Sequence, residues 1–582
     1  MQERVDGSHA GTAAWERPGV IALPRLAVWC TPLALYLVAL VALLTPWLFA
    51  AHPAWAYNWE EYTAWRLSTY WESPEGPSRE IWAPTDGLMT DSGQGPLVGL
   101  PAALGMALDG HTITAMRVPV SLLAAAAVPL LWLLARMTTG GGAAAFAALL
   151  LAVSPAYLIY GRTATLVGIS LVPLLLTAIA LVRVLDAPAG TGWRWRREGL
   201  LAATLLGGIY AYAPVRLLWP LVLLLLGFAA WRGRERRGHL VRTVVLCVLI
   251  VPGALALAEQ FAAPDPDPLA AVLGYFHARG EQLVALREDP VTLTSYLRED
   301  GVPPEDAWGR AWLLVRQNTS DLGRLLLDRE TASVLTDYWN PMGRLWPWFL
   351  GPWAVIGAVW SIRSAWRDGR TALVVPVALA AGLTLPLLLT TRVHVGRLLP
   401  AFPFALLLAA AGVWAVSRWL GRVFRTARAP MAARVVAPWL GLMVLLPTVA
   451  VARNDLAASV PPSPETMTAA ALAAWYPEVE RRGGAVLVEA PKGDEIERVH
   501  VAAYQLELDP HYRFIDLQRR EAVETGGRPP LYWHDALGAL AAGMLSGACE
   551  RLWFVAPDVN DAFLAAWRRA GCAGAPASVT LP

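Results

Sequence analysis

The feature that most constrains this fold is a series of long stretches that carry almost no charge. Residues 26–49, 113–134 and 398–416 are examples. A helix rises about 1.5 Å per residue, so about 20 apolar residues cross the ~30 Å hydrocarbon core of a bilayer. The chain of 582 residues is 56% hydrophobic and only 16% charged, which leaves too little polar surface to cover so many helices in a soluble protein. The sequence therefore predicts an all-α polytopic membrane protein.

Eleven apolar ranges are predicted to cross the membrane. They are 26–49, 113–136, 143–160, 164–184, 199–212, 215–231, 241–260, 346–363, 371–391, 398–418 and 435–453. The range 96–108 is also apolar, but as a helix it would reach only about 20 Å, so we expect it to lie in the membrane interface. The first apolar run is too long for a cleavable signal peptide and lacks a small-residue cleavage site, so we expect it to be retained as a span.

The arginines between these ranges predict the orientation of the chain. Positive charge marks cytoplasmic loops, and the short loops on one side are rich in arginine and poor in acid. These arginines are Arg136, Arg183, Arg194, Arg196, Arg197, Arg232, Arg234, Arg236, Arg237, Arg363, Arg367, Arg370, Arg418, Arg422, Arg425, Arg428 and Arg434. The cytoplasmic side then also holds the N-terminal segment 1–25, and the opposite side holds 50–112, 261–345 and 454–582. We therefore expect a multi-pass protein of a bacterial-type inner membrane. Counting 96–108 as a further crossing would invert the loops that follow it and spoil this pattern.

Residues 454–582 are predicted to form a small extracytoplasmic α/β domain. Ranges 484–489, 514–517 and 552–555 have the character of short strands, and 500–506 and 561–570 that of helices. An oxidising compartment could join Cys549 to Cys572, whereas Cys30 and Cys247 lie in apolar stretches and are expected to be core residues. The sequence contains no glycine-rich phosphate loop and no cluster of metal ligands.

Ionisable side chains are nearly absent from the middles of the predicted spans, which argues against an ion-coupled transporter. Charged side chains gather instead at the outer ends of spans, at Arg117, Arg162, Arg216, Arg392, His394 and Arg397. Snorkelling to the interface explains any one of them. The whole set, on the side where positive charge is disfavoured, indicates an anion at the outer leaflet such as a lipid phosphate, which the planar arginine fork binds in a bidentate manner.

The first outer loop contains candidate acids. Glu60 and Glu61 lie in the sequence YNWEEY at 57–62, and Asp86 and Asp91 follow later in the loop. A carboxylate that tryptophans partly desolvate near the membrane has a raised pKa and can accept a proton from an attacking hydroxyl. The alternative is an ordinary acidic loop.

Five segments in order resemble the GT-C superfamily of glycosyltransferases, in particular the group with the protein O-mannosyltransferases and the lipid A aminoarabinose transferase. They span about residues 25–455, and each is weak alone. The acidic pair Glu60-Glu61 takes the place of Asp-Glu, and GQGPL at 93–97 that of His-Pro-Pro-Leu, with Gln94 in place of the histidine. The others are MRVPVS at 116–121, AVSP at 152–155 followed by YGRTA at 160–164, and GRLLPAFP at 396–403.

The resemblance implies a polyprenyl-phosphate-sugar-dependent enzyme of the cell envelope. Such an enzyme moves a sugar from the lipid carrier to a lipid, glycan or protein acceptor on the non-cytoplasmic side, with inversion. Glu60, or failing it Glu61, would be the general base. Arg162 and Arg397, supported by Arg117, Arg216 or Arg392, would hold the departing phosphate. A divalent metal could bridge carboxylate and phosphate, although no dedicated ligands are evident and no cofactor is certain.

Other functions fit the same residues. A non-catalytic lipid-carrier transporter, or a membrane assembly subunit with an outer binding domain, would need the outer arginines but not the glutamates. Hydrolysis would keep the same residues and change only the acceptor. In the stretch 261–345, the aromatic residues Trp308, Trp312, Tyr338 and Trp339 could form a lid or sugar-binding wall, or could be interfacial anchors. No nucleic-acid partner is expected.

Overall fold

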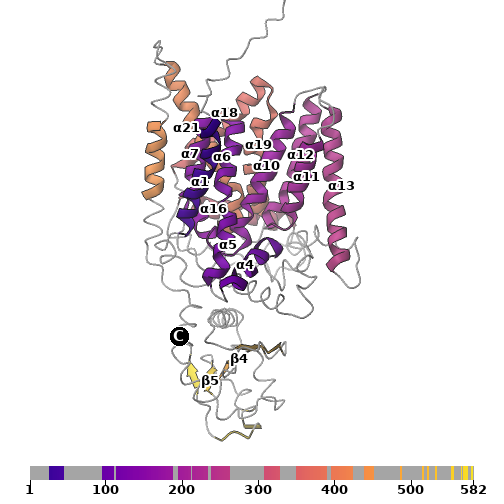
Figure 1. Cartoon of the computed structure of the whole chain (residues 1–582), viewed down its shortest axis with the longest axis vertical. Coiled ribbons are helices and arrows are strands. Elements are labelled where there is room, and N and C mark those ends of the chain that lie inside the picture. The colour runs from indigo at the N-terminus through magenta and orange to yellow at the C-terminus, as the bar shows by residue number, and fades with distance from the viewer. Residues whose placement is uncertain are drawn as a thin grey trace, which may run out of the picture.

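The structure, a computed structural model, describes residues 25–44, 95–109, 113–187, 195–211, 213–233, 237–262, 307–327, 349–389, 393, 395–423 and 438–450 of the helical part. Beyond it, the structure describes six short strands and residues 565, 568–569 and 571–573. Figure 1 shows the helices as one bundle, with α4 (Gly95–Asp109) and α5 (Ile113–Ala124) at its lower end.

The other helices follow in chain order. They are α1 (Arg25–Leu44), α6 (Ala127–Thr138), α7 (Gly141–Ala152), α8 (Pro155–Tyr160), α9 (Leu166–Ile169), α10 (Leu171–Leu185), α11 (Trp195–Ile209), η2 (Ala213–Leu217), α12 (Leu218–Arg232), α13 (Arg237–Ala262), α16 (Ala307–Leu327), α18 (Leu350–Asp368), η4 (Thr371–Val374), α19 (Val375–Thr384), η5 (Leu385–Leu389), α20 (Val395–Leu398), η6 (Leu399–Ala401) and α21 (Phe402–Val423). A further apolar helix covers Pro438–Ala450.

Six helices in the described ranges are long and apolar enough to cross a membrane. They are Thr114–Thr138, Leu166–Leu185, Val215–Arg232, Arg237–Leu257, Thr371–Leu389 and Val395–Leu420, and each coincides with one predicted crossing. The other five predicted ranges contain helices that are shorter or carry charge. The first turn of α11 carries Arg196, Arg197 and Glu198, and α18 ends with Arg367 and Asp368. The count of eleven crossings therefore stays a prediction.

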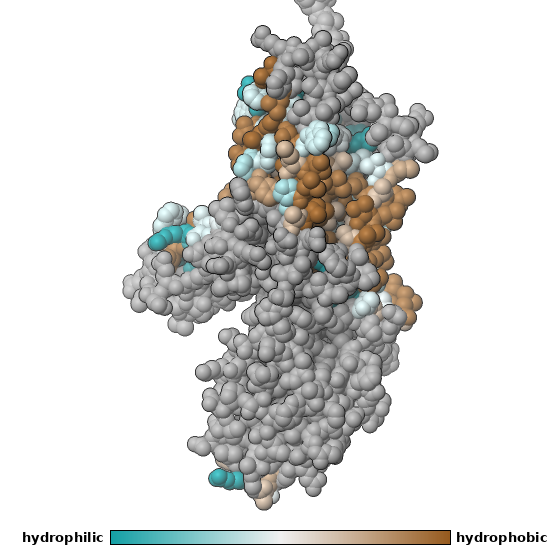
Figure 2. Space-filling model, turned by 90° about the vertical axis from the view of Figure 1, so that its left-hand side faces the viewer, coloured by the Kyte–Doolittle hydropathy of each residue, from teal (hydrophilic) through white to brown (hydrophobic). Residues whose placement is uncertain are grey.

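The outside of this bundle is apolar, as a lipid solvent requires. Large side chains such as Leu224, Leu249, Val355 and Val359 are exposed on it. Figure 2 shows such surface as brown areas over the helical part of the molecule. The α4 segment is 15 residues long, about 22 Å at the helical rise, and it packs along α5. This length agrees with the expected short helix, and its position in the interface stays a prediction.

Contacts between loops confirm that several predicted cytoplasmic segments share one end of the bundle. Arg370 Nη2 donates a hydrogen bond to Asp186 Oδ2 at 2.9 Å and contacts the Met137 carbonyl oxygen at 3.4 Å. The Arg232 guanidinium lies 4.7 Å from the centre of the Trp366 ring. Four of the predicted cytoplasmic connections therefore meet, as the loop charges predicted. Which side of the membrane this end faces stays a prediction.

Helices α18 and α21 cross at close range, with a glycine from each helix at the crossing. A Cβ atom added at Gly357 would clash with the Leu408 carbonyl oxygen, and one added at Gly412 would clash with the Trp353 carbonyl oxygen. Small residues let helix backbones approach where lipid provides no hydrophobic drive for association. These two helices therefore pack at backbone contact.

The C-terminal strands form one sheet. Its strands are β1 (Ala485–Leu487), β2 (Phe514–Asp516), β3 (Glu521–Ala522), β4 (Leu531–Trp533), β5 (Leu552–Val555) and β6 (Ser578–Thr580), in the order β3-β2-β4-β1-β5-β6. All pairs are parallel except β2 with β3. Strands β1, β2 and β5 lie inside the three ranges predicted as strands.

Parallel neighbours need long crossover connections, which are usually helices. The predicted helix at 500–506 lies outside the described residues, as does most of the one at 561–570, so the α/β domain stays a prediction. Cys572 is disulfide-bonded, whereas Cys30 and Cys247 are free. The fourth cysteine of the chain, Cys549, lies outside the described residues.

Candidate functional site

Arg162 is held in a buried turn between two short helices. Pro155 starts α8 at its first turn, where the missing N–H of proline costs nothing. The chain then folds back on itself so closely that a Cβ atom on Gly168 would clash with the Tyr160 carbonyl oxygen. In this turn the Arg162 side chain is 0% exposed, and its Nε donates a hydrogen bond to the Leu158 carbonyl oxygen at 2.6 Å. The local fold therefore fixes one edge of the guanidinium inside the protein.

A second arginine acts electrostatically on the first. Arg117 lies in α5 and is 2% exposed. Burial, and then the positive charge of Arg117, lower the pKa of Arg162 to about 9. Arg162 therefore still carries its proton near neutral pH. Two buried positive charges within electrostatic range raise each other's free energy, and an anion bound beside them lowers it.

Hydroxyl groups accompany the two arginines. Thr163 Oγ1 lies 3.1 Å from Thr165 Oγ1, and both side chains are buried directly after Arg162. Ser121 follows Arg117 by one helical turn, and its buried hydroxyl has no hydrogen-bond partner within the part of the chain that the structure describes. Hydroxyls can donate hydrogen bonds to phosphate oxygens. These three residues were not predicted as site residues, although the polar run RTAT at 162–165 between two apolar ranges was a signal for Thr163 and Thr165.

Short helices bring three of the family-like segments together. α9 packs against α4, α5 and η6, and α20 packs against α8. The GRLLPAFP segment with Arg397, the YGRTA segment with Arg162 and the MRVPVS segment with Arg117 therefore meet around α9. Arg397 is half-buried in α20. We refer to this meeting point as the arginine site.

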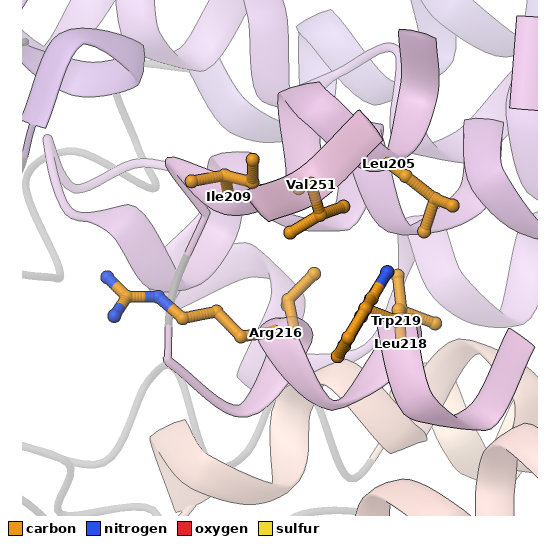
Figure 3. Close-up of a pocket in the computed structure, with 8 residues that line it drawn as sticks. Leu205, Ile209, Arg216, Leu218, Trp219 and Val251 are labelled. Carbon is orange, nitrogen blue, oxygen red and sulfur yellow. The ribbon is translucent and has the colours of Figure 1, made fainter. Parts of the chain in front are cut away.

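Arg216 lies in a different group of helices. Its segment η2 packs on α11, α12 and α19. Arg216 lines a small pocket together with apolar residues of η2, α11, α12 and α13, namely Leu205, Gly208, Ile209, Val215, Leu218, Trp219 and Val251. Figure 3 shows the Arg216 side chain extending away from Trp219, with its guanidinium at the far end. The pocket wall is held by Trp219, whose Nε1 donates to the Cys247 carbonyl oxygen at 2.8 Å. An apolar pocket with a cation at its edge suits an amphiphilic anion.

The remaining predicted site residues lie outside the described residues. They are Glu60, Glu61, Asp86, Asp91, Arg392 and His394. Their roles therefore stay predictions. Among the described residues, no group of three or more histidine, cysteine, aspartate or glutamate side chains could hold a metal ion.

Comparison with known proteins agrees with the motifs. A family model described as dolichyl-phosphate-mannose-protein mannosyltransferase matches residues 93–256, which include Arg117, Arg162 and Arg216. No curated protein sequence matches the chain.

Solved structures also match the chain, among them these two. The first is the archaeal oligosaccharyltransferase AglB from Archaeoglobus fulgidus in complex with an inhibitory peptide and a dolichol-phosphate, with a TM-score of 0.50 and 12% identity. That match covers 82% of this chain but only 64% of AglB, so the chain spans less than two thirds of its length. The second is ArnT from Cupriavidus metallidurans bound to undecaprenyl phosphate, with a TM-score of 0.40, 14% identity, and coverage of 88% of this chain and 86% of ArnT. In its motifs and in the family model that it matches, the chain resembles the GT-C glycosyltransferases.

Proposed function

We propose that the chain is an inverting glycosyltransferase that moves a sugar from a polyprenyl-phosphate carrier to an acceptor at the outer face of the membrane. The observation that carries this proposal is the arginine site. It places two buried guanidinium groups, Arg117 and Arg162, where three family-like segments meet. A site of this kind suits a phosphate that gains negative charge as its bond to the sugar breaks.

The phosphate is the leaving group in this mechanism. Arg162 and Arg117 bind its oxygens and stabilise the charge that develops on it, with Arg397 beside them. The buried hydroxyl of Thr165 is proposed to add a hydrogen bond, while Thr163 Oγ1 donates to the Tyr160 carbonyl oxygen at 3.2 Å and supports Thr165. Arg216, Arg392 and His394 are proposed to support the lipid phosphate or the first part of its chain, and Arg216 lies at the edge of an apolar pocket.

A carboxylate of the first outer loop is proposed as the base. Glu60, or otherwise Glu61, takes the proton of the acceptor hydroxyl as its oxygen bonds to the anomeric carbon. The bond from that carbon to the phosphate oxygen breaks in the same step, and its electron pair leaves with the phosphate. A single displacement of this kind inverts the anomeric carbon. Asp86 and Asp91 are the next candidates for the base.

The partners follow from the same mechanism. AglB and ArnT were solved with dolichol-phosphate and undecaprenyl phosphate respectively, and we propose a polyprenyl-linked donor here, with a lipid, glycan or protein as acceptor. A divalent metal held by the loop carboxylates would supply charge neutralisation at the phosphate. The described residues contain no ligand cluster against which to test this fit, and no step above depends on a metal.

The proposed topology puts this chemistry on the non-cytoplasmic side of the membrane. The N-terminal segment 1–25 is proposed to be cytoplasmic, with the outer loops 50–112 and 261–345 and the α/β domain 454–582 on the other side. An enzyme with this arrangement would act at the outer face of a bacterial-type inner membrane.

Consumption of the lipid donor tests the function. Purified protein is supplied with polyprenyl-phosphate-linked hexoses and pentoses, with membrane extract as the source of acceptors. The variants Glu60→Gln, Glu61→Gln and Arg162→Gln are compared with Arg367→Gln, which removes an exposed arginine paired with Asp368 at the other end of the bundle. We expect loss of the base to slow turnover about 100- to 10,000-fold while donor binding is kept. Arg162→Gln should lose both, and Arg367→Gln neither.

Other outcomes identify the alternatives. Turnover that survives in both glutamate variants would move the base to Asp86 or Asp91. Release of free sugar without transfer would indicate hydrolysis. Tight binding of the lipid phosphate with no turnover of any donor would contradict the enzyme and leave a lipid-carrier transporter or an assembly subunit.

A further inference from the structure

Helix α16 buries three polar side chains. Its buried face carries Arg310, Leu314, Asn318 and Asp321, which follow one another at helical spacing. Asn318 Nδ2 donates a hydrogen bond to the Leu388 carbonyl oxygen at 2.9 Å, so α16 is fixed against η5.

The outward face of α16 begins with two tryptophans. Trp308 is 86% exposed and Trp312 is 69% exposed. Arg316 is also exposed. Because the three residues are spaced by four, they form one stripe about 12 Å long on the helix. We call Trp308, Trp312 and Arg316 the α16 stripe.

The neighbouring segment fixes the level of this stripe relative to the membrane. η5 ends the apolar helix Thr371–Leu389, whose other end adjoins Arg370 and its contacts with the arginine-rich loops. α16 therefore lies at the end of the bundle opposite those loops. Leu385 and Leu389 of η5 are exposed apolar side chains beside it. The apolar band on the outside of the bundle thus continues up to η5, which α16 contacts through Asn318.

We propose that α16 is an interfacial helix whose stripe binds the headgroup region of the outer leaflet. Tryptophan favours this region because its ring is apolar and its N–H needs a polar partner. Arg316, two turns further along, would contact a lipid phosphate. The stripe points away from the polar face that packs on η5, whereas the aromatic wall of a sugar site would have to face the bundle. The outer loop is thereby held both to the protein and to the bilayer.

Spin labelling in nanodiscs tests this proposal on the full-length chain. Free Cys30 and Cys247 are replaced by alanine, and a cysteine for a nitroxide label is introduced by Trp312→Cys. A second variant, Thr319→Cys, carries the label on the same exposed face while both tryptophans remain. Val359→Cys, at an exposed position of α18, is the lipid reference, and Asp368→Cys is the aqueous reference. The nanodiscs contain phosphatidylethanolamine and phosphatidylglycerol, and the background without an added cysteine measures residual labelling.

Accessibility to two relaxing agents gives the depth of each label, because oxygen concentrates in the bilayer and a nickel chelate stays in water. We expect the oxygen-to-nickel accessibility ratio at positions 312 and 319 to lie between those of Val359→Cys and Asp368→Cys. A ratio at both positions equal to that of Asp368→Cys would overturn the proposal and place the tryptophans in water. An intermediate accessibility ratio at position 312 together with an aqueous ratio at position 319 would also contradict a helix that lies along the interface.

Discussion

Arg117 and Arg162 illustrate what burial adds to a sequence argument. Snorkelling accounts for an arginine whose head group reaches water, but these two side chains are 2% and 0% exposed. The Nε hydrogen bond to the Leu158 carbonyl oxygen holds Arg162 inside the turn. Snorkelling to water therefore does not describe these two side chains in the structure, and their role in binding an anion stays a prediction.

Replacement of Arg162 by lysine tests the need for a planar fork. Lysine keeps the charge but loses the paired N–H groups, and charge-assisted hydrogen bonds contribute about 1.5–3 kcal/mol each. We expect Arg162→Lys to weaken binding of polyprenyl phosphate by about 10- to 100-fold. The measurement is a binding titration, with Arg367→Lys as the control at the other end of the bundle. Equal affinity in wild type and Arg162→Lys would mean that charge alone is recognised.

The pH dependence of the same binding is a separate prediction. Because burial and Arg117 lower the pKa of Arg162 to about 9, the guanidinium is protonated below that pH and loses its charge as the pH rises through it. Phosphate binds the protonated form, so affinity should be constant from about pH 7 to 8 and fall above about pH 9. Arg162→Gln should bind weakly without this fall. A wild-type affinity that stays flat through this range would contradict the role of Arg162.

At the level of elements, hydropathy predicted where helices lie but not where they break. The predicted crossing 113–136 contains a turn at Ala125 and Ala126, and 143–160 is divided before Pro155. Such breaks depend on tertiary packing and on single prolines, which the average hydropathy of a range does not record. The break before Pro155 matters because it creates the short helix α8, and Arg162 lies in the turn between α8 and α9.

The crossing of α18 with α21 gives a prediction about stability. A methyl group at Gly357 or Gly412 would force two helix backbones apart, so Gly357→Ala and Gly412→Ala should each lower the unfolding free energy by about 1–3 kcal/mol. Gly351→Ala is the control on the same helix, since a Cβ there meets nothing and alanine favours helix. Thermal unfolding in detergent compares the three. Equal melting temperatures for Gly357→Ala and Gly351→Ala would show that the crossing contributes little.

At the level of the whole molecule, the membrane orientation that the loop arginines predict can be tested by labelling. Single cysteines introduced by Ser320→Cys in α16 and by Asp368→Cys at the end of α18 lie at opposite ends of the bundle. In intact cells, a maleimide that cannot cross the membrane should label position 320 directly and position 368 only after permeabilisation. The reverse pattern would invert the proposed orientation and place the arginine site on the cytoplasmic side.

The candidate site could be predicted from the sequence only in part. Arg117 and Arg162 stood out because charge is rare at the ends of apolar ranges. Thr163, Thr165 and Ser121 did not, since uncharged hydroxyls are common in membrane helices and only their burial beside the arginines distinguishes them. Nor could spacing reveal that Arg216 packs with α11 and α12 rather than at α9, because that depends on which helices are neighbours in space.

The buried charge of Arg117 has a consequence for biogenesis. Arg117 lies near the start of the span Thr114–Thr138, and an arginine raises the cost of inserting a single helix by up to about 3 kcal/mol at its centre. Its helix α5 packs against α4, which is synthesised earlier, and against α9 and α10, which are synthesised later. The surroundings of this charge are therefore complete only once the chain has been made as far as α10.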